Sequence, residues 1–315
     1  MKSENQNACM RLSCIVIALV AVTVAVIPSR AGQKGAPARD NPPTEAERKA
    51  LLDRVFANQH NDDNSLQFFQ RVEHRRFRDK DAGEDYTDDR VMRIIPTGAG
   101  SARILLDDHG HATRQSELRT QMALVEHQLE AALDESNAQS KRDREKFERR
   151  NRERNELVSE VRNAFIFTWE GRETLGGRQL TKFRLEPNPN YHATSHESEI
   201  FSHSRATVWV DENAGQVARL EGELTSDIPF YGGLAAKVYR GGKFVLEQTE
   251  VEPGIWLPSL QQYDFAWRKV FFQEGFHERL EDSHYVRIGS PTQELASIRK
   301  ELADSSTNTG SVRNP

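Results

Sequence analysis

The chain has 315 residues, and its 43 Lys and Arg against 48 Asp and Glu give a formal net charge of −5 at pH 7. This acidic balance gives no support for nucleic-acid binding, which requires a dense basic surface. Both cysteines, Cys9 and Cys14, fall in residues 1–31, which are predicted below to be removed. Disulfides, thiolate catalysis and cysteine-ligated metal are therefore excluded for the remaining chain.

The N-terminus has the three parts of a secretory signal peptide. Lys2 and Arg11 make its start positive, an apolar stretch of 13 residues follows at Ile15–Ile27, and the small residues Ser29 and Ala31 come next. This stretch is too short to span the roughly 30 Å of a membrane core as a helix, so an uncleaved anchor is the weaker alternative. The pattern predicts cleavage after Ala31, a periplasmic location and no transmembrane segment in the mature chain.

A short helix is predicted after a flexible lead-in. Residues 32–43 are rich in Gly, Pro and Ala, which favours a linker. Thr44 and Glu47 have the spacing of a capping box, which predicts a helix over about residues 45–59. Its apolar side chains would lie on one side: Leu51, Leu52, Val55 and Phe56.

Three antiparallel strands are predicted next, at residues 66–77, 86–96 and 102–106. Each is rich in β-forming residues, and turns containing Gly separate them at residues 80–83 and 97–100.

Residues 115–163 contain no Gly or Pro and have helical periodicity. The apolar stripe consists of Leu118, Met122, Val125, Leu129 and Ala132. From residue 134 to 155 the stripe gives way to an almost wholly charged run. The pattern predicts one long helix or two helices joined by a mobile link, with a solvated middle. A helix that binds a partner protein is the alternative.

The rest of the chain reads as a series of strands joined by hairpins. They are predicted at residues 165–169, 179–185, 200–210, 216–225, 234–239, 244–251, 256–267, 270–280 and 285–288. A flat sheet of about ten or eleven strands would leave apolar faces and edges uncovered, so it must curl or pair. The predicted fold class is α+β: a strongly curved, antiparallel, half-open β-barrel with helices covering its concave side. It forms a single domain over residues 44–290, followed by a polar tail at 291–315. The spacing of Leu295, Ile298 and Leu302 indicates that a helix starts in this tail, while residues 305–315 have a disordered composition.

No catalytic or metal site is predicted. His109 and His111 lie in an Asp/Gly turn, which favours a solvated loop over a metal site. His192, His196 and His203 match no helical zinc spacing, although an unrecognised hydrolase that uses them stays a third hypothesis. No Gly-x-Ser-x-Gly elbow is present.

Two charged groups have a functional and an ordinary interpretation. Glu221 and Glu223 project from one face of a strand, where paired carboxylates are more often solvated than catalytic. Arg75, Arg76 and Arg78 form a small basic cluster that would suit anionic lipid headgroups or simply a wet outer face.

The C-terminal half resembles the LolA-like superfamily of outer-membrane lipoprotein-sorting proteins, in an uncharacterised secreted bacterial branch. The segments that carry the resemblance are GRETLGGRQLTKFRLEPNPNY, ATVWVDENAGQVARLEGEL, GGLAAKVYRGGKFVLEQ, GIWLPS and HYVRI. The resemblance covers roughly residues 45–290 and implies an incomplete barrel closed by helices, with an apolar cavity that takes lipoprotein acyl chains. The sequence departs from that family in its longer charged segment at 134–155, and the family's lipid-handling arginine aligns with no one position here.

A lipid carrier needs a continuous apolar lining, since each acyl CH₂ hidden from water gains about 0.8 kcal/mol. The candidate lining residues are large apolar side chains of the predicted strands. They are Phe165, Phe167, Trp169, Leu220, Leu224, Phe244, Leu246, Trp256, Phe265, Trp267 and Phe271. Ordinary sheet core is the alternative for each of them.

The sequence thus predicts a non-catalytic periplasmic carrier for lipid acyl chains or lipoproteins, with no cofactor. The alternative is a structural or protein-interaction module of the cell envelope that uses the charged helix to bind an envelope protein and carries no ligand.

Overall fold

The computed structural model describes residues 41–79, 85–134, 136–175, 177–230, 236–269 and 272–308. The signal peptide predicted at 1–31, the lead-in up to residue 40 and the last residues of the tail lie outside these ranges. No helix within them is long and apolar enough to cross a membrane.

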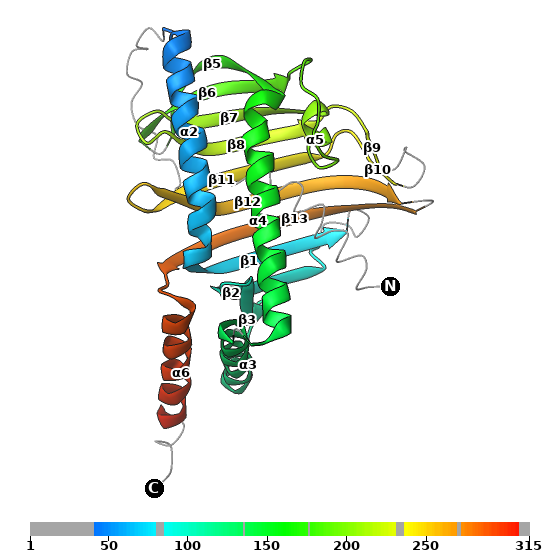
Figure 1. Ribbon diagram of the computed structural model, residues 1–315. Helices are drawn as coiled ribbons and strands as arrows, with labels where there is room; N and C mark the ends of the chain where they lie inside the picture. The colour runs from blue at the N-terminus through cyan, green and yellow to red at the C-terminus, as the bar shows by residue number, and fades with distance from the viewer. Residues whose placement is uncertain are drawn as a thin grey trace. The chain divides into compact units, whose positions relative to one another are not determined.

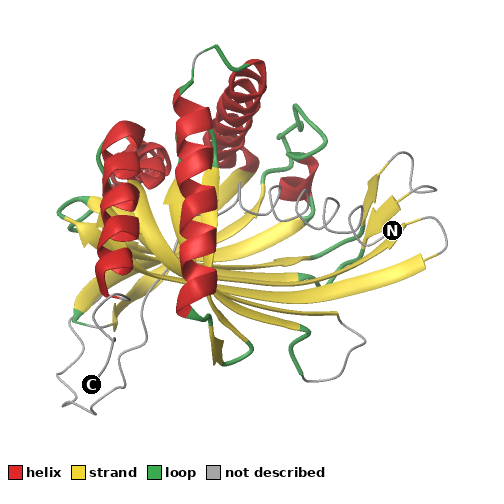
Figure 2. Cartoon of the chain, turned by 90° about the horizontal axis from the view of Figure 1, so that it is seen from below, coloured by secondary structure: helices red, strands yellow, loops and turns green. Residues whose placement is uncertain are grey.

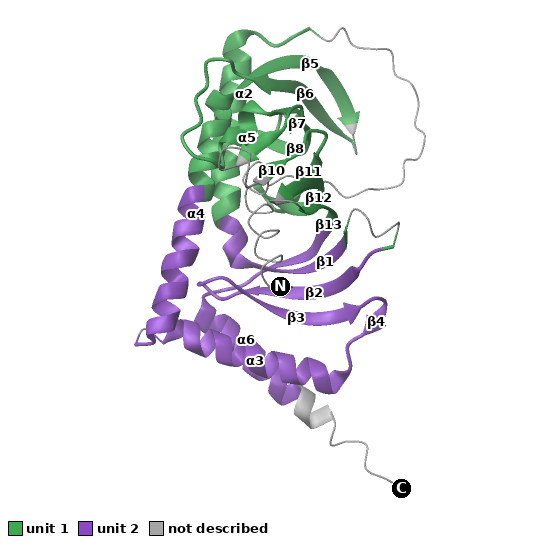
Figure 3. Ribbon diagram, turned by 90° about the vertical axis from the view of Figure 1, so that its right-hand side faces the viewer, with its two compact units in different colours: residues 1–64, 78–85, 154–279 green, residues 65–77, 86–153, 280–315 purple. Residues whose placement is uncertain are grey.

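The chain forms two compact units, coloured separately in Figure 3. Unit 1 comprises residues 1–64, 78–85 and 154–279, and unit 2 comprises residues 65–77, 86–153 and 280–315. Strand β13 (Phe272–Arg287) and helix α4 (Ala138–Ala164) contribute residues to both units.

Unit 1 contains an antiparallel sheet in the order β13-β12-β11-β8-β7-β6-β5, with a short β9–β10 pair beside β12 (Figure 1). The strands other than β13 are β5 (Phe165–Leu175), β6 (Arg178–Pro187), β7 (Ser204–Asp211), β8 (Gln216–Leu224), β9 (Ile228–Phe230), β10 (Ala236–Val238), β11 (Lys243–Glu252) and β12 (Ile255–Lys269). The strand predicted from residue 200 begins at Ser204. The reason is that Ile200 and Phe201 are buried in the one-turn helix α5 (Glu199–Ser202).

The register of unit 1 gathers its large apolar side chains on one face. Residues directly opposite each other in an antiparallel pair project from the same face. One row across the strands runs through Phe167, Leu185, Ala206, Gly222, Phe244 and Tyr263. The next row runs through Trp169, Phe183, Val208, Leu220 and Leu246. We call this surface the apolar face.

Helix α2 (Glu45–Ser65) and residues 154–164 of α4 lie on the same side of the unit 1 strands (Figures 1 and 2). Phe56 of α2 meets Phe167 of the apolar face edge to face, with ring centroids 6.2 Å apart. The predicted capping box is present, since Thr44 N–H donates to a Glu47 carboxylate oxygen at 2.8 Å. The two helices therefore cover the apolar face of this unit.

Helix α2 extends six residues beyond its predicted end at residue 59. The added turns are polar, and side-chain contacts stabilise them in place of apolar packing. Asp62 Oδ1 accepts the backbone N–H of Trp256 at 3.2 Å, and Asp63 pairs with Arg154 of α4 at 2.6 Å. Local sequence could not show these partners, because they lie far along the chain.

Gly222 leaves room for the far end of the Phe244 ring, because a Cβ added at Gly222 would overlap that ring. We expect Gly222→Ala to destabilise the protein by about 1–3 kcal/mol through overpacking, measured as a lower denaturant midpoint. Phe244→Leu in the same chain should recover part of that loss by removing the overlapping ring atoms. Equal losses in the single and double variants would contradict this packing.

Unit 2 contains the order β4-β3-β2-β1-β13, again antiparallel. Its other strands are β1 (Phe69–Asp79), β2 (Asp88–Pro96), β3 (Ser101–Asp108) and β4 (His111–Ala112). The 3-10 turn η1 (Leu66–Phe68) precedes β1. The three strands predicted in this region correspond to β1, β2 and β3, with ends shifted by up to three residues.

Helices α3 (Gln115–Leu133) and α6 (Pro291–Asn308) form the core of unit 2 with β2 and β3. The buried members of this cluster are Ile95, Ala102, Ile104, Val125, Leu129, Leu295 and Ile298. Residues 291–308, the first part of the predicted polar tail, fold as a helix whose apolar side packs on α3. The spacing of Leu295, Ile298 and Leu302 indicated that a helix starts there.

The segment predicted as one or two helices is two helices, α3 and α4. Asn137 Oδ1 accepts the backbone N–H of Gln139 at 2.9 Å, which caps the start of α4. Asp134 likewise accepts the Ser136 N–H at 2.9 Å beyond the end of α3. Short polar side chains thus stabilise a break between the two helices. The pattern of charges in the sequence did not show where this break would occur.

The predicted α+β class is confirmed: antiparallel strands form a large sheet that does not close, and helices pack against it. Among the described strands, β4, β5 and β9 each have a single neighbour. Thirteen strands are present in the described ranges, where the sequence predicts about ten or eleven.

Candidate functional site

Ten of the eleven candidate lining residues lie in the described part of unit 1, and Phe271 lies outside it. They are distributed over β5 (Phe165, Phe167, Trp169), β8 (Leu220, Leu224), β11 (Phe244, Leu246) and β12 (Trp256, Phe265, Trp267). The register brings most of the β5, β8 and β11 residues together on the apolar face.

Several of these side chains are packed core. Phe244, Leu246 and Phe265 are 1%, 0% and 1% exposed. A side chain that lined a water-sized space would keep accessible area, so these three fill the interior in this conformation. Phe265 also contacts the Phe276 ring at 6.1 Å between centroids. The middle of the apolar face is therefore closed by its own rings.

Trp256 lies in a separate small cluster. It packs with buried Leu180 and Ala218, and the Arg178 guanidinium lies 4.7 Å from the centre of its indole. Tertiary contacts at the start of β12 place this side chain away from Phe244 and Leu246, which sequence alternation could not reveal.

The β5 end of the apolar face is less completely covered. We define it by Phe56, Phe167 and Trp169, which are all only half-buried. The Arg162 guanidinium lies 6.0 Å above the Phe56 ring. The Trp169 Nε1–H is buried and has no hydrogen-bond partner among the described residues. Buried donors are nearly always satisfied, so this indole N–H is an unsatisfied donor at the β5 end of the apolar face.

Unit 1 also contains a buried polar cluster that the sequence did not suggest. Asp62 is 1% exposed, and its neighbours Gln59, Gln216 and Gln248 are buried as well. Gln248 Nε2 donates to Gln59 Oε1 at 3.1 Å. Burial raises the pKa of Asp62 to about 7, which outweighs the lowering by hydrogen bonds from the Trp256 backbone and Gln216. No signal in the sequence distinguishes these residues from ordinary solvated ones.

Unit 2 has a buried ionic cluster between neighbouring strands β1 and β13. Arg71 Nε donates to Asp282 Oδ1 at 2.8 Å, and Arg71 also pairs with Glu73 at 3.6 Å. Burial strongly raises the pKa of Tyr285, and the Asp282 carboxylate adds to this. Although burial disfavours its charge, the carboxylates hold the pKa of Arg71 above its ordinary value. Arg71 is therefore a fixed cation in this unit.

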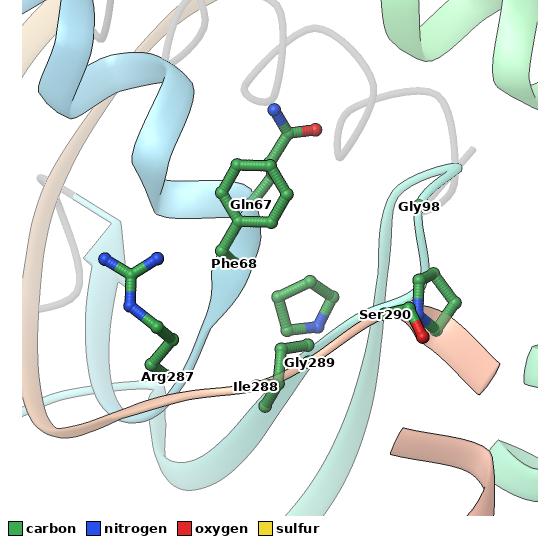
Figure 4. Close-up of a pocket in the computed structure, with 9 residues that line it drawn as sticks. Gln67, Phe68, Gly98, Arg287, Ile288, Gly289 and Ser290 are labelled. Atoms are coloured by element: carbon green, nitrogen blue, oxygen red, sulfur yellow. The ribbon is translucent and has the colours of Figure 1, made fainter. Parts of the chain in front are cut away.

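A pocket of about 400 Å³ lies in unit 2 at the connection from β13 to α6 (Figure 4). Phe68 is 46% exposed at this pocket, and the Arg287 guanidinium lies 4.6 Å from the centre of the Phe69 ring. Its walls are Gln67, Phe68, Pro96, Gly98, Arg287, Ile288, Gly289, Ser290 and Pro291. Its volume suits a small molecule, and none of these residues was predicted from the sequence.

The histidines considered in the sequence are mostly exposed. His109 is exposed beside Asp108, with Nδ1 2.7 Å from its carboxylate, and His203 Nδ1 is 2.7 Å from Ser226 Oγ. His111, His192 and His196 are exposed. Within the described ranges, no group of three His, Cys, Asp or Glu side chains is arranged to hold a metal ion.

The charged groups considered in the sequence are largely paired. Arg75 pairs with Asp88 at 3.2 Å, and Arg76 pairs with Glu281. Glu221 and Glu223 pair with Arg219 and Arg205. The basic cluster at Arg75 and Arg76 is thus neutralised by neighbouring carboxylates.

Neither a family model nor a curated protein matches the sequence. Several solved structures are similar. One is a putative outer membrane lipoprotein-sorting protein domain from Vibrio parahaemolyticus, with 10% identity, a TM-score of 0.32, and coverage of 76% of this chain and 92% of that chain. Another is a LolA superfamily protein from Nitrosomonas europaea, with 10% identity, a TM-score of 0.27, and coverage of 77% and 93%.

A DUF1329 family protein from Desulfovibrio piger has 12% identity and a TM-score of 0.28 over 76% of this chain and 92% of that chain. Two of these three names agree with the lipoprotein-sorting resemblance in the sequence. At such TM-scores the likenesses assign no role to any residue of this chain.

Proposed function

We propose that the protein is a non-catalytic carrier that binds a lipid acyl chain, free or attached to a protein, at the β5 end of the apolar face. The observation that carries the proposal is the half-buried pair Phe167 and Trp169, with an unpartnered indole N–H beside apolar rings. An acyl chain would cover the rings, and its carboxylate or ester oxygen would accept the indole N–H.

The energy of such binding comes from apolar area. Each methylene transferred from water to the apolar face contributes about 0.8 kcal/mol, so about ten methylenes would contribute on the order of 8 kcal/mol, from which the entropy cost of association is subtracted. The packed middle of the face, around Phe244 and Leu246, limits how deep a guest enters in this conformation. The export signal expected in residues 1–31 would bring this carrier to the periplasm.

Phe167→Asp should weaken uptake of a fluorescent fatty acid at least about tenfold, because the guest would then bury an unpaired carboxylate. The measurement is fluorescence titration of the purified protein, with circular dichroism to verify the fold. Ile166→Asp is the matched control, since Ile166 is the preceding residue of β5, points to the opposite face and is 49% exposed.

Trp169→Phe tests the indole separately, because it keeps the apolar area and removes only the N–H donor. It should weaken binding of the fatty acid but leave binding of a long-chain alkane probe unchanged. A wild-type protein that takes up neither probe, or equal effects of the Phe167 and Ile166 variants, would argue against a site at the β5 end.

A further inference from the structure

The part of α4 that belongs to unit 2 has an exposed face made entirely of charged side chains. Between residues 141 and 153 nine side chains are exposed. Six are cations (Lys141, Arg142, Lys146, Arg149, Arg150, Arg152) and three are anions (Glu145, Glu148, Glu153). The half-buried positions Arg144, Phe147 and Asn151 follow helical spacing on the other side. The packing of the helix therefore places the nine exposed side chains on one side of α4, which we call the cationic face.

Contacts to the end of α3 fix which side of α4 points to solvent. Ser140 is buried and its hydroxyl donates to the Ala131 carbonyl oxygen, while Arg144 Nη2 donates to the Ala132 carbonyl oxygen at 3.0 Å. Both contacts lie on the half-buried side of the helix. The cationic face is thus held outward by structure within the same unit.

Six cations against three anions leave this face with a net charge of +3. The ion pairs that its cations form are Lys146–Asp143 at 3.5 Å and Arg149–Glu153 at 3.7 Å, both exposed and therefore weak. Lys141, Arg142 and Arg152 have no ion pair among the described residues. The face carries an excess of positive charge on a chain whose net charge is −5.

We propose that the cationic face is a docking surface for a membrane rich in anionic phospholipid. Thirteen residues of helix present these cations along roughly 20 Å, which matches a plane of laterally mobile headgroups. Each Lys or Arg near such a surface contributes about 1 kcal/mol. The nine exposed side chains of this face are all charged, so it offers no apolar anchor of the kind that specific protein interfaces use. The acidic remainder of the chain would be repelled, so contact would be oriented through α4.

This docking adds a membrane contact to the proposed carrier, but it does not depend on ligand uptake. The test is cosedimentation of the full chain with phosphatidylglycerol vesicles and, separately, with phosphatidylcholine vesicles. Binding to the anionic vesicles alone is expected, and it should fall as salt is raised. Lys141→Gln, Arg142→Gln and Arg152→Gln combined should weaken binding by about a hundredfold, since three cations are removed without loss of helix propensity.

The matched control removes the same charge elsewhere, with Arg184→Gln, Arg240→Gln and Lys243→Gln at exposed positions of unit 1. It should bind anionic vesicles nearly as well as the wild type. Equal losses in both triple variants would overturn the proposal, as would binding to poly-glutamate without binding to vesicles, which would indicate an acidic protein partner. Fatty-acid uptake by the α4 variant should be unchanged, so failure of docking and failure of the carrier role are separable.

Discussion

Replacing Asp282 with alanine is expected to lower the free energy of unfolding by about 3–5 kcal/mol, because the Arg71 guanidinium would lose its closest carboxylate inside the protein. The two side chains are 14% and 2% exposed, and Arg71 Nε lies 2.8 Å from Asp282 Oδ1. Glu73, 3.6 Å from Arg71, remains as a weaker partner. Urea denaturation at neutral pH measures the loss.

A double-mutant cycle separates this pair from general damage to the core. Arg71→Met with Asp282→Leu should lose less than the sum of the two single variants, because the direct Arg71–Asp282 interaction can be lost only once, while Glu73 loses Arg71 both in the Arg71 single variant and in the double variant. Glu117→Ala provides the surface comparison, since it breaks the exposed Arg114–Glu117 pair and should change stability little. An Asp282→Ala variant as stable as Glu117→Ala would show that Arg71 is solvated.

Asp62→Asn is expected to stabilise the protein above pH 7 by on the order of 4 kcal/mol and to have little effect near pH 4. Asp62 lies on the buried side of α2, and its Oδ2 has no hydrogen-bond partner among the described residues. The nearby Gln216 Oε1 also has none. An asparagine amide can donate to Gln216 while its oxygen keeps the Trp256 N–H.

The direction follows from the raised pKa of Asp62, about 7 in the folded protein because of burial. The folded state favours the protonated form of Asp62. The contribution of this carboxyl to the free energy of unfolding is therefore fully present below the ordinary unfolded pKa of about 3.9 and is lost as pH rises through about 7. The charged groups that face Asp62 are few: neighbouring Asp63 raises its pKa further, and Arg154 of α4 pairs with Asp63.

Thermal or urea unfolding across pH 4–8 checks this expectation. Asp63→Asn is the control: it should destabilise the protein at every pH in that range, because it leaves Arg154 without its carboxylate. A wild type and an Asp62→Asn variant with parallel stability profiles would mean that Asp62 is ionised in the folded state throughout.

Local patterns were sufficient for most secondary structure. Two-residue alternation around Gly and Asp turns predicts the strands, as at Asp211 and Gly215, where Asp211 accepts two backbone N–H groups of the turn. The Thr44–Glu47 capping box correctly begins α2, and the stripe containing Val125 and Leu129 correctly predicts α3. In each case the interacting groups are close in sequence.

The candidate site was only partly accessible from the sequence. Large apolar residues on alternating positions identified the face that contains Phe167, Trp169 and Phe244. Which of them are filled core and which are half-covered depends on α2, whose Phe56 lies more than a hundred residues earlier in the chain. The pocket beside Phe68 likewise needs segments from three separate parts of unit 2.

By itself, the sequence determined the α+β class, the order of strands and helices, and the apolar face, because these follow from periodicity and turn chemistry within a few residues. Only the tertiary structure decided that the polar side chain of Asp62 is buried, that Arg75 and Arg76 are neutralised and that α4 turns its cations outward. These outcomes depend on which distant groups come within hydrogen-bond reach, since burial and pairing set the energy of a charge far more than its neighbours in the chain do.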